Sequence, residues 1–135
     1  MSSTSTNKPT KRAVGRRKRA IASVYFFPGT GKITVNGMDV AKYFPGEFAK
    51  KVYSQPMQLT EVEKYDISVK VLGGGKSGQL DAMVLGIARA LVKSKADHKP
   101  ILRKAGLITR DSRERQRRMV GTGGKARRQK SSPKR

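Results

Sequence analysis

Three successive glycines, Gly73-Gly74-Gly75, stand directly before Lys76 and Ser77, and this run is the part of the sequence nearest to a phosphate-binding loop. A nucleotide-binding P-loop also needs a glycine five residues before Gly75, where this chain has Lys70, so nucleotide hydrolysis is not expected. Successive glycine amides at the start of a helix attract anions, and Lys76 adds positive charge, so the loop could hold a phosphate group. Alternatively, the glycines permit a tight turn in which neighbouring backbones pack closely. Both interpretations stay open.

The other titratable side chains form no recognisable catalytic arrangement. His98 is the only histidine and has no second ligand at metal-binding spacing, so we expect a solvated residue in a loop or first helical turn. Two close carboxylate pairs, Glu61 with Glu63 and Asp111 with Glu114, stand among charged residues and are interpreted as surface salt-bridge partners. The absence of cysteine excludes disulfides and thiolate metal sites. The sequence therefore predicts a protein that is not an enzyme and has no cofactor or metal.

Basic residues are the strongest chemical signal in the chain, and they are unevenly distributed. The 135 residues include 31 Lys and Arg against 9 Asp and Glu, which gives a formal net charge of +22. Residues 1–19 hold seven basic and no acidic residues, 20–98 hold ten and seven, and 99–135 hold fourteen and two. Because like charges oppose compaction, we expect a nearly balanced domain with two cationic arms that become ordered on a polyanion.

Nucleic acid is the polyanion that suits arms of this composition. Arg binds phosphate through a planar fork and Lys through a point charge, so both neutralise a phosphate backbone without reading its sequence. We expect Asp111 to cap a short helix that runs to Val120, and no regular structure after Gly121. The predicted RNA-binding cations are Arg16, Arg17, Lys18, Arg19, Lys76, Arg110, Arg113, Arg117, Arg118, Lys125, Arg127, Arg128 and Lys130.

Between the arms, alternation and turn residues predict a small α+β domain with helices packed on one face of a sheet. Strands are expected at 20–27 and 32–35, joined as a β-hairpin by the turn at 28–31, and at 64–72. The domain spans residues 13–108, with 1–12 as a disordered extension and 109–135 as an extended basic tail. Tyr25, Phe26, Phe27, Tyr43 and Phe44 are interpreted as core residues rather than as platforms for stacked bases.

Four helices are expected from capping residues and apolar spacing. A short one begins at Asp39 and ends before Pro45-Gly46, and a second covers 47–53 and is broken by Pro56. A long helix follows the glycines with Ser77 as its N-cap, and a short one begins at Asp97 and ends at Gly106. The apolar face of the long helix consists of Leu80, Val84, Ile87, Ala88 and Leu91.

Several blocks, taken in order, resemble the universal S-nine family of bacterial small-subunit ribosomal proteins. The resemblance covers about residues 13–135 and is specific because so many blocks match in order. The matching blocks are Gly73-Gly74-Gly75-x-x-Gly78-Gln79-x-x-Ala82-x-x-x-Gly86-x-Ala88-Arg89-Ala90-Leu91, Gly15-Arg16-Arg17-Lys18, Pro28-Gly29-x-Gly31-Lys32-Ile33-x-Val35-Asn36, Tyr43-Phe44, Leu102-Arg103-x-Ala105-Gly106-Leu107-Ile108-Thr109-Arg110-Asp111, and the basic ending.

The resemblance implies a fold like the second domain of the fifth small-subunit protein, with a left-handed βαβ crossover. It also implies a cytoplasmic protein in the head of the small ribosomal subunit, bound to the 3′ major domain of 16S ribosomal RNA (rRNA) beside neighbouring head proteins. The tail is then expected to reach the anticodon stem-loop of transfer RNA (tRNA) in the peptidyl site, which Lys134 and Arg135 contact. Bacterial members commonly end in Ser-Lys-Arg, whereas this chain has Pro133, which lacks a backbone donor.

Composition alone leaves other classes of protein to weigh. A free nucleic-acid chaperone or DNA-compacting protein is the main alternative. A membrane-surface peptide needs bulky apolar residues opposite its cations, and residues 109–135 lack such a face, so no membrane partner is expected. An organellar transit peptide would suit the serine-rich, acid-free start, but the foldable pattern begins by Ala20 and leaves little room for one.

Overall fold

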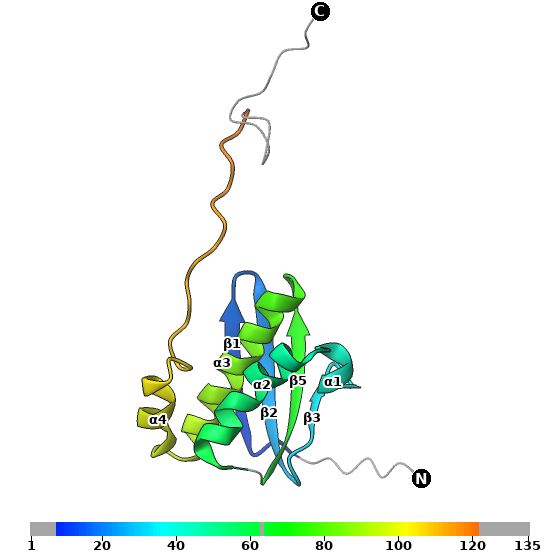
Figure 1. The fold of residues 1–135 in the computed structure, drawn as a ribbon, viewed down its shortest axis with the longest axis vertical. Helices are drawn as coiled ribbons and strands as arrows, with labels where there is room; N and C mark the ends of the chain where they lie inside the picture. The colour runs from blue at the N-terminus through cyan, green and yellow to red at the C-terminus, as the bar shows by residue number, and fades with distance from the viewer. Residues whose placement is uncertain (1–7, 63, 122–135) are drawn as a thin grey trace, which may run out of the picture.

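The computed structural model describes residues 8–62 and 64–121, which form an α+β domain followed by an extended segment (Figure 1). The domain has one five-stranded mixed sheet in the order β1-β2-β5-β3-β4. The helices α2 and α3 cover one face of this sheet, as predicted, and α4 packs against both of them (Figure 1). The elements are β1 Lys11–Arg17, β2 Ala20–Pro28, β3 Ile33–Val35, β4 Met38–Asp39, α1 Val40–Tyr43, α2 Glu47–Thr60, β5 Tyr65–Leu72, α3 Lys76–Ser94 and α4 His98–Lys104.

The predicted hairpin between the strands at 20–27 and 32–35 is wrong. β2 pairs antiparallel with β1 on one side and with β5 on the other, whereas β3 runs parallel to β5. The chain therefore crosses the end of β5 before β3 begins. Asp66 on β5 holds this crossing, since one of its carboxylate oxygens accepts the backbone amides of Thr30, Gly31 and Lys32 at 3.0, 3.2 and 3.1 Å. These donors, that of Lys32 first, lower the pKa of Asp66 from its usual value.

β1 is a strand that the sequence did not predict, because its alternating cations resemble a flexible arm. Ala13 and Gly15 are buried beneath α3, while Arg12 and Arg16 are exposed on the other face. β1 is an edge strand, and α3 covers its free carbonyls: Arg89 donates to the oxygen of Val14 and Lys93 to that of Arg12, both at 2.8 Å. The structured domain thus begins inside the expected N-terminal extension.

α3 is the helix that sets the position of the core. Its predicted apolar residues Leu80, Val84, Ile87, Ala88 and Leu91 are all buried, which confirms the helical period. Its N-cap is Gly75 with no side-chain cap, so the prediction of Ser77 as N-cap is wrong. Gly73 and Gly74 have φ of +75° and +65°, a conformation that turns the chain into the helix before Ser77 is reached.

α2 continues through Pro56, although proline was predicted to end it. A proline inside a helix loses one backbone hydrogen bond and costs about 3 kcal/mol. Here Ala49, Tyr53, Pro56 and Thr60 recur at helical spacing and are all buried in the face that meets α3 and α4. Burial of this continuous face offsets the lost bond, which local sequence signals could not show.

Three further expectations about the C-terminal half are corrected. His98 starts α4 as predicted, but it is buried rather than solvated, because it shares the packed face of that helix with Leu102 four residues later. Asp97 stands at the N-cap position of α4 without accepting a capping hydrogen bond. The helix expected from Asp111 to Val120 is absent, and residues 110–119 have no helix or strand.

Gly15 provides a direct test of how closely β1 approaches α3. A Cβ atom at Gly15 would collide with backbone atoms of Ala82 and Gly86, which cannot move as a flexible side chain can. We predict that Gly15→Ala lowers the free energy of unfolding by at least about 2 kcal/mol. Gly75→Ala is the matched control, because Gly75 has φ −100° and open space around its Cβ position. Urea denaturation measures both, and equal stability of the two variants would contradict this packing.

Candidate nucleic-acid interface

Three segments that are distant in sequence meet at one end of the domain. The turn between β1 and β2 lies beside the glycine loop before α3, and the C-terminal segment passes next to both. Together they line a hollow of about 490 Å³, which we call the basic hollow. Its lining residues are Arg17, Lys18, Arg19, Gly74, Gly75, Gly78, Glu114, Arg115, Gln116 and Arg117. Five of these ten are cationic and one is acidic, so the two basic arms predicted from the sequence converge on one site.

The glycines are required here for a close approach of backbones. A Cβ atom at Gly73 would lie 2.7 Å from the backbone oxygen of Arg19, and one at Gly74 would lie 3.1 Å from the nitrogen of Ala20. Both glycines also have positive φ, which side chains disfavour. The structural interpretation of the glycine run is therefore confirmed, while its role in holding a phosphate stays a prediction. What the close approach achieves is to bring Lys18 and Arg19 next to the start of α3.

Lys76 differs from the sequence-based expectation, because it turns away from the basic hollow. Its ammonium lies 3.4 Å from the centroid of the Tyr43 ring and donates to the backbone oxygen of Tyr43 at 3.3 Å. The Tyr43 hydroxyl in turn donates to Gln79 at 2.8 Å. Lys76 therefore ties α1 to α3 and contributes charge to the neighbourhood of the hollow without lining it.

Arg17 is the residue that joins the C-terminal segment to the domain. Its side chain is only 13% exposed, and its Nε and Nη2 lie 3.6 and 3.3 Å from carboxylate oxygens of Asp81 and Asp111. Its Nη1 donates to the backbone oxygen of Arg113 at 2.8 Å. We call this set of contacts the Arg17 clasp. Although Arg17 was predicted to bind RNA, its guanidinium is largely used within the chain.

Asp111 is the acidic centre of the Arg17 clasp. It accepts the side chain of Arg113 at 2.6 Å and the backbone amide of Arg113 at 3.0 Å, so Arg113 too is folded back onto the chain. The Arg113 side chain is the main reason that the pKa of Asp111 lies well below its usual value. A lowered folded pKa means that the clasp persists above the ordinary aspartate pKa of about 3.9 and opens only on further acidification. Asp111 is thus a salt-bridge partner, as predicted.

Arg115 is a lining residue that the sequence-based selection did not include. The selection assumed a helix after Asp111, which would place Arg115 and Arg117 on different sides. In the observed extended segment, Arg115 and Arg117 both line the basic hollow, together with Glu114 and Gln116. The concentration of arginines between residues 113 and 118 was the signal that could have identified this segment.

The remaining predicted cations are distributed as follows. Arg16 is exposed on the face of the sheet away from the helices, and Arg110 and Arg118 are exposed on the C-terminal segment. Six predicted contacts lie outside the described residues: Lys125, Arg127, Arg128, Lys130, Lys134 and Arg135. In residues 8–62 and 64–121, no three acidic or histidine side chains are grouped to hold a metal, and no helix is long and apolar enough to cross a membrane.

Comparison with known proteins identifies the family. The family model described as ribosomal protein S9/S16 matches residues 15–135. The small ribosomal subunit protein uS9 of Bacteroides fragilis is 53% identical over 110 residues, which cover 81% of this chain and 86% of the relative. The uS9 of Phocaeicola vulgatus is 51% identical over the same shares, and that of Ureaplasma parvum is 47% identical over 114 residues, 84% and 86% of the two chains. The resemblance found in the sequence is confirmed: this chain belongs to the ribosomal protein S9 family, which is structural and not enzymatic.

Proposed function

We propose that this protein is a structural constituent of the small ribosomal subunit that binds 16S rRNA in the head of the subunit. The observation that carries the proposal is the basic hollow, where five cations from the β1–β2 turn and the C-terminal segment line one space beside the glycine loop. Phosphate groups of folded RNA are the ligands that such a site suits, since Arg and Lys hold the backbone without reading bases. Neighbouring head proteins are the other partners in this proposal, and the cytoplasmic ribosome is its location.

The fold proposal goes one step beyond the observed α+β sheet. The parallel pair β3 and β5 is joined by a crossover that contains α1 and α2. We assign this crossover the left-handed sense of the second domain of the fifth small-subunit protein. The family match supports this assignment, with 13–108 as the globular RNA-binding domain and 109–135 as the tail. The boundary at 13 falls within β1, which begins at Lys11.

The tail is proposed to reach the anticodon stem-loop of tRNA in the peptidyl site. The Arg17 clasp supports this role, because it sets the point and direction in which the tail leaves the domain. From Gly121 onward, fully extended residues reach on the order of 50 Å at about 3.3 Å per residue. Lys134 and Arg135 are the proposed contacts, and they bind the tRNA backbone through charge, independently of its sequence.

Sedimentation of a cell lysate in moderate salt tests whether the protein is a ribosomal component. We predict that the chain migrates with small subunits in a sucrose gradient and that little of it remains free. A predominantly free or chromosome-bound pool would instead favour the alternative of a nucleic-acid chaperone or DNA-compacting protein. Raising the salt concentration should release the chain steeply, because each neutralised phosphate takes up counterions again.

Deletion of residues 133–135 separates the role of the tail from that of the domain. We predict that the truncated chain enters small subunits as the full chain does, since the basic hollow is intact. Retention of tRNA in the peptidyl site should fall several-fold, because two cations are removed from its backbone. Filter binding of tRNA to purified subunits measures this. Unchanged retention would show that the tail end has no such role.

Asp111→Asn tests whether the Arg17 clasp positions the tail. The variant keeps the shape of the side chain but removes the charge that Arg17 and Arg113 share. We predict that backbone order parameters of residues 110–113, measured by 15N relaxation on the free protein, fall from about 0.85 to below about 0.6. Asp97→Asn is the control, because its pair with Lys95 is exposed and lies outside the tail. Order parameters that stay high in Asp111→Asn would contradict a positioning role.

A further inference from the structure

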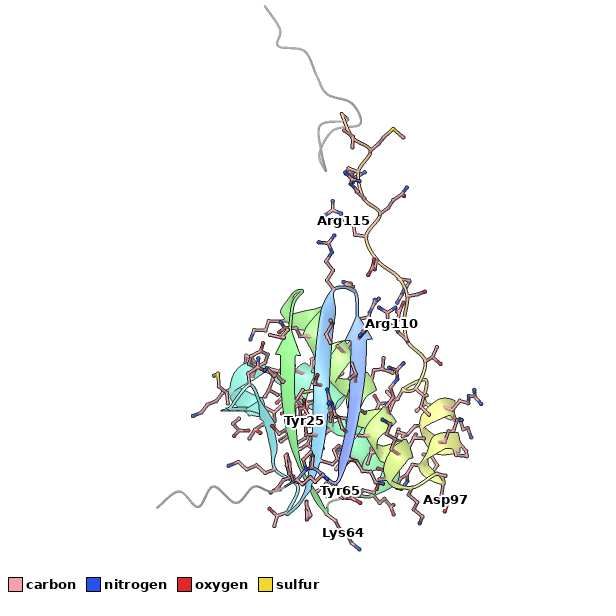
Figure 2. All side chains as sticks on the ribbon, turned by 180° about the vertical axis from the view of Figure 1, so that it is seen from behind. Tyr25, Lys64, Tyr65, Asp97, Arg110 and Arg115 are labelled. Carbon is pink, nitrogen blue, oxygen red and sulfur yellow. The ribbon has the colours of Figure 1, made fainter. Side chains whose placement is uncertain are left out.

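The sheet has a second face that carries no helix among the described residues. β1, β2 and β5 turn alternate side chains away from α3, and Figure 2 views the sheet from this side, with Tyr25 in front of the strands. The strand register places these side chains in rows across the face. One row is Arg16, Ile21 and Leu72, the next is Val14, Ser23 and Lys70, and a third is Arg12, Tyr25, Ser68 and Thr34. We call this surface the open face.

Aromatic residues on the open face do not belong to the core. Five aromatic residues were predicted to belong to the core. Phe26 and Phe44 are buried and Tyr43 packs against the core, which confirms the prediction for these three. For Tyr25 and Phe27 the prediction is wrong. Both lie on the open face, are half-buried by their neighbours and do not belong to the core cluster. Ile21 and Leu72, which pair across β2 and β5, are 41% and 63% exposed. The open face therefore offers ring and aliphatic surfaces to a partner.

The charge of the open face favours an anionic partner. Arg12, Arg16 and Lys70 are exposed there, and the ion pairs found among the described residues include none of the three. Two acidic residues belong to its rows: Asp66, one carboxylate oxygen of which accepts the three loop amides, and Asp39, which pairs with Thr34 and accepts the backbone amide of Ala41 at 3.4 Å. The Arg12 guanidinium lies 5.5 Å from the centroid of the Tyr25 ring, so a cation and an aromatic ring form one platform. Such platforms suit stacked bases of nucleic acid.

A hollow lies at the end of the open face beyond Tyr25. Its volume is about 410 Å³, and its lining includes Phe27, Lys32, Thr34, Asp66 and Ser68. One carboxylate oxygen of Asp66 is held by the backbone amides of Thr30, Gly31 and Lys32. An aromatic ring, two hydroxyls and a lysine are groups that can receive an unpaired base and its phosphate. At the opposite end, Arg16 adjoins Arg17 and the turn that lines the basic hollow, so the cationic surface continues from one site to the other.

We propose that the open face is a second RNA-binding surface, on which an unpaired strand of 16S rRNA lies against Arg12, Arg16 and Lys70 and stacks a base on Tyr25. This inference rests on the proposed function, because it assumes that the chain binds rRNA. A protein partner fits less well, since the exposed aliphatic pair occupies one end while cations extend across the face. An acidic protein surface is the competing occupant that the experiment must detect.

Directed cleavage from a tethered iron chelate identifies the occupant. The chain has no cysteine, so Ser23→Cys provides a single attachment point in the middle row of the open face. Lys50→Cys on the exposed side of α2 is the matched control. In subunits assembled with each full-length variant, we expect the chelate at position 23 to cut 16S rRNA at a strand that the chelate at position 50 leaves intact. Cleavage of a neighbouring protein alone from position 23 would overturn the proposal.

Affinity measurements test which side chains of the open face contribute to binding. Full-length variants are titrated into subunits assembled without this protein, and the double variant Arg16→Gln with Lys70→Gln is compared with Lys50→Gln with Lys99→Gln. We expect the first to bind at least tenfold more weakly and its salt slope to decrease by about 1.4, at about 0.7 for each contact to single-stranded nucleic acid. We expect Tyr25→Val to weaken binding at least about fivefold with an unchanged salt slope.

The outcomes separate this inference from the function on which it rests. Equal losses of affinity in the two double variants would show a general effect of charge. That result would overturn the proposal that the open face binds RNA specifically. If Tyr25→Val binds with wild-type affinity, no base stacks on Tyr25 and that part of the proposal is wrong. If the wild-type chain itself fails to join the depleted subunits, the proposed function is wrong rather than the assignment of the face.

Discussion

A chain of 135 residues with 31 Lys and Arg side chains and 9 Asp and Glu must keep its cations apart while it buries a core. Repulsion among like charges is the constraint that explains where the basic residues lie. They gather at the β1–β2 turn, along the C-terminal segment and on the helix-free face of the sheet, while the core cluster is apolar. Such a distribution leaves positive charge facing outward, where an RNA backbone can neutralise it.

The few acidic residues determine how the cationic segments are held. Asp111 binds Arg17 and so joins the tail to β1, while Asp81 binds the same arginine from α3. Asp66 fastens the loop that carries Lys32. Glycines also hold the cationic segments in position, because they let backbones approach closely. Gly15 lets β1 lie against α3, and Gly73 lets the glycine loop approach Arg19, so backbone contacts too narrow for a side chain set the position of the basic hollow.

Local patterns in the sequence predicted those elements whose signals are local. β-branched and aromatic residues identified β2, alternation identified β5, and the helical period identified the buried face of α3. β1 was missed because Ala13 and Gly15 alternate with arginines that also suit a disordered arm. The pairing of β3 with β5 depends on Asp66, which lies more than thirty residues from the loop it holds. The convergence of the two arms depends on Arg17 and Arg113, which are 96 residues apart, and no local pattern encodes that contact.

A high-resolution reconstruction of the small ribosomal subunit containing this chain would show what occupies the basic hollow. We predict sugar-phosphate backbone there, with phosphate oxygens about 2.8 Å from the charged groups of Lys18, Arg19, Arg115 and Arg117. Density that shows the hollow filled by solvent or by another protein, with the nearest RNA elsewhere, would contradict it.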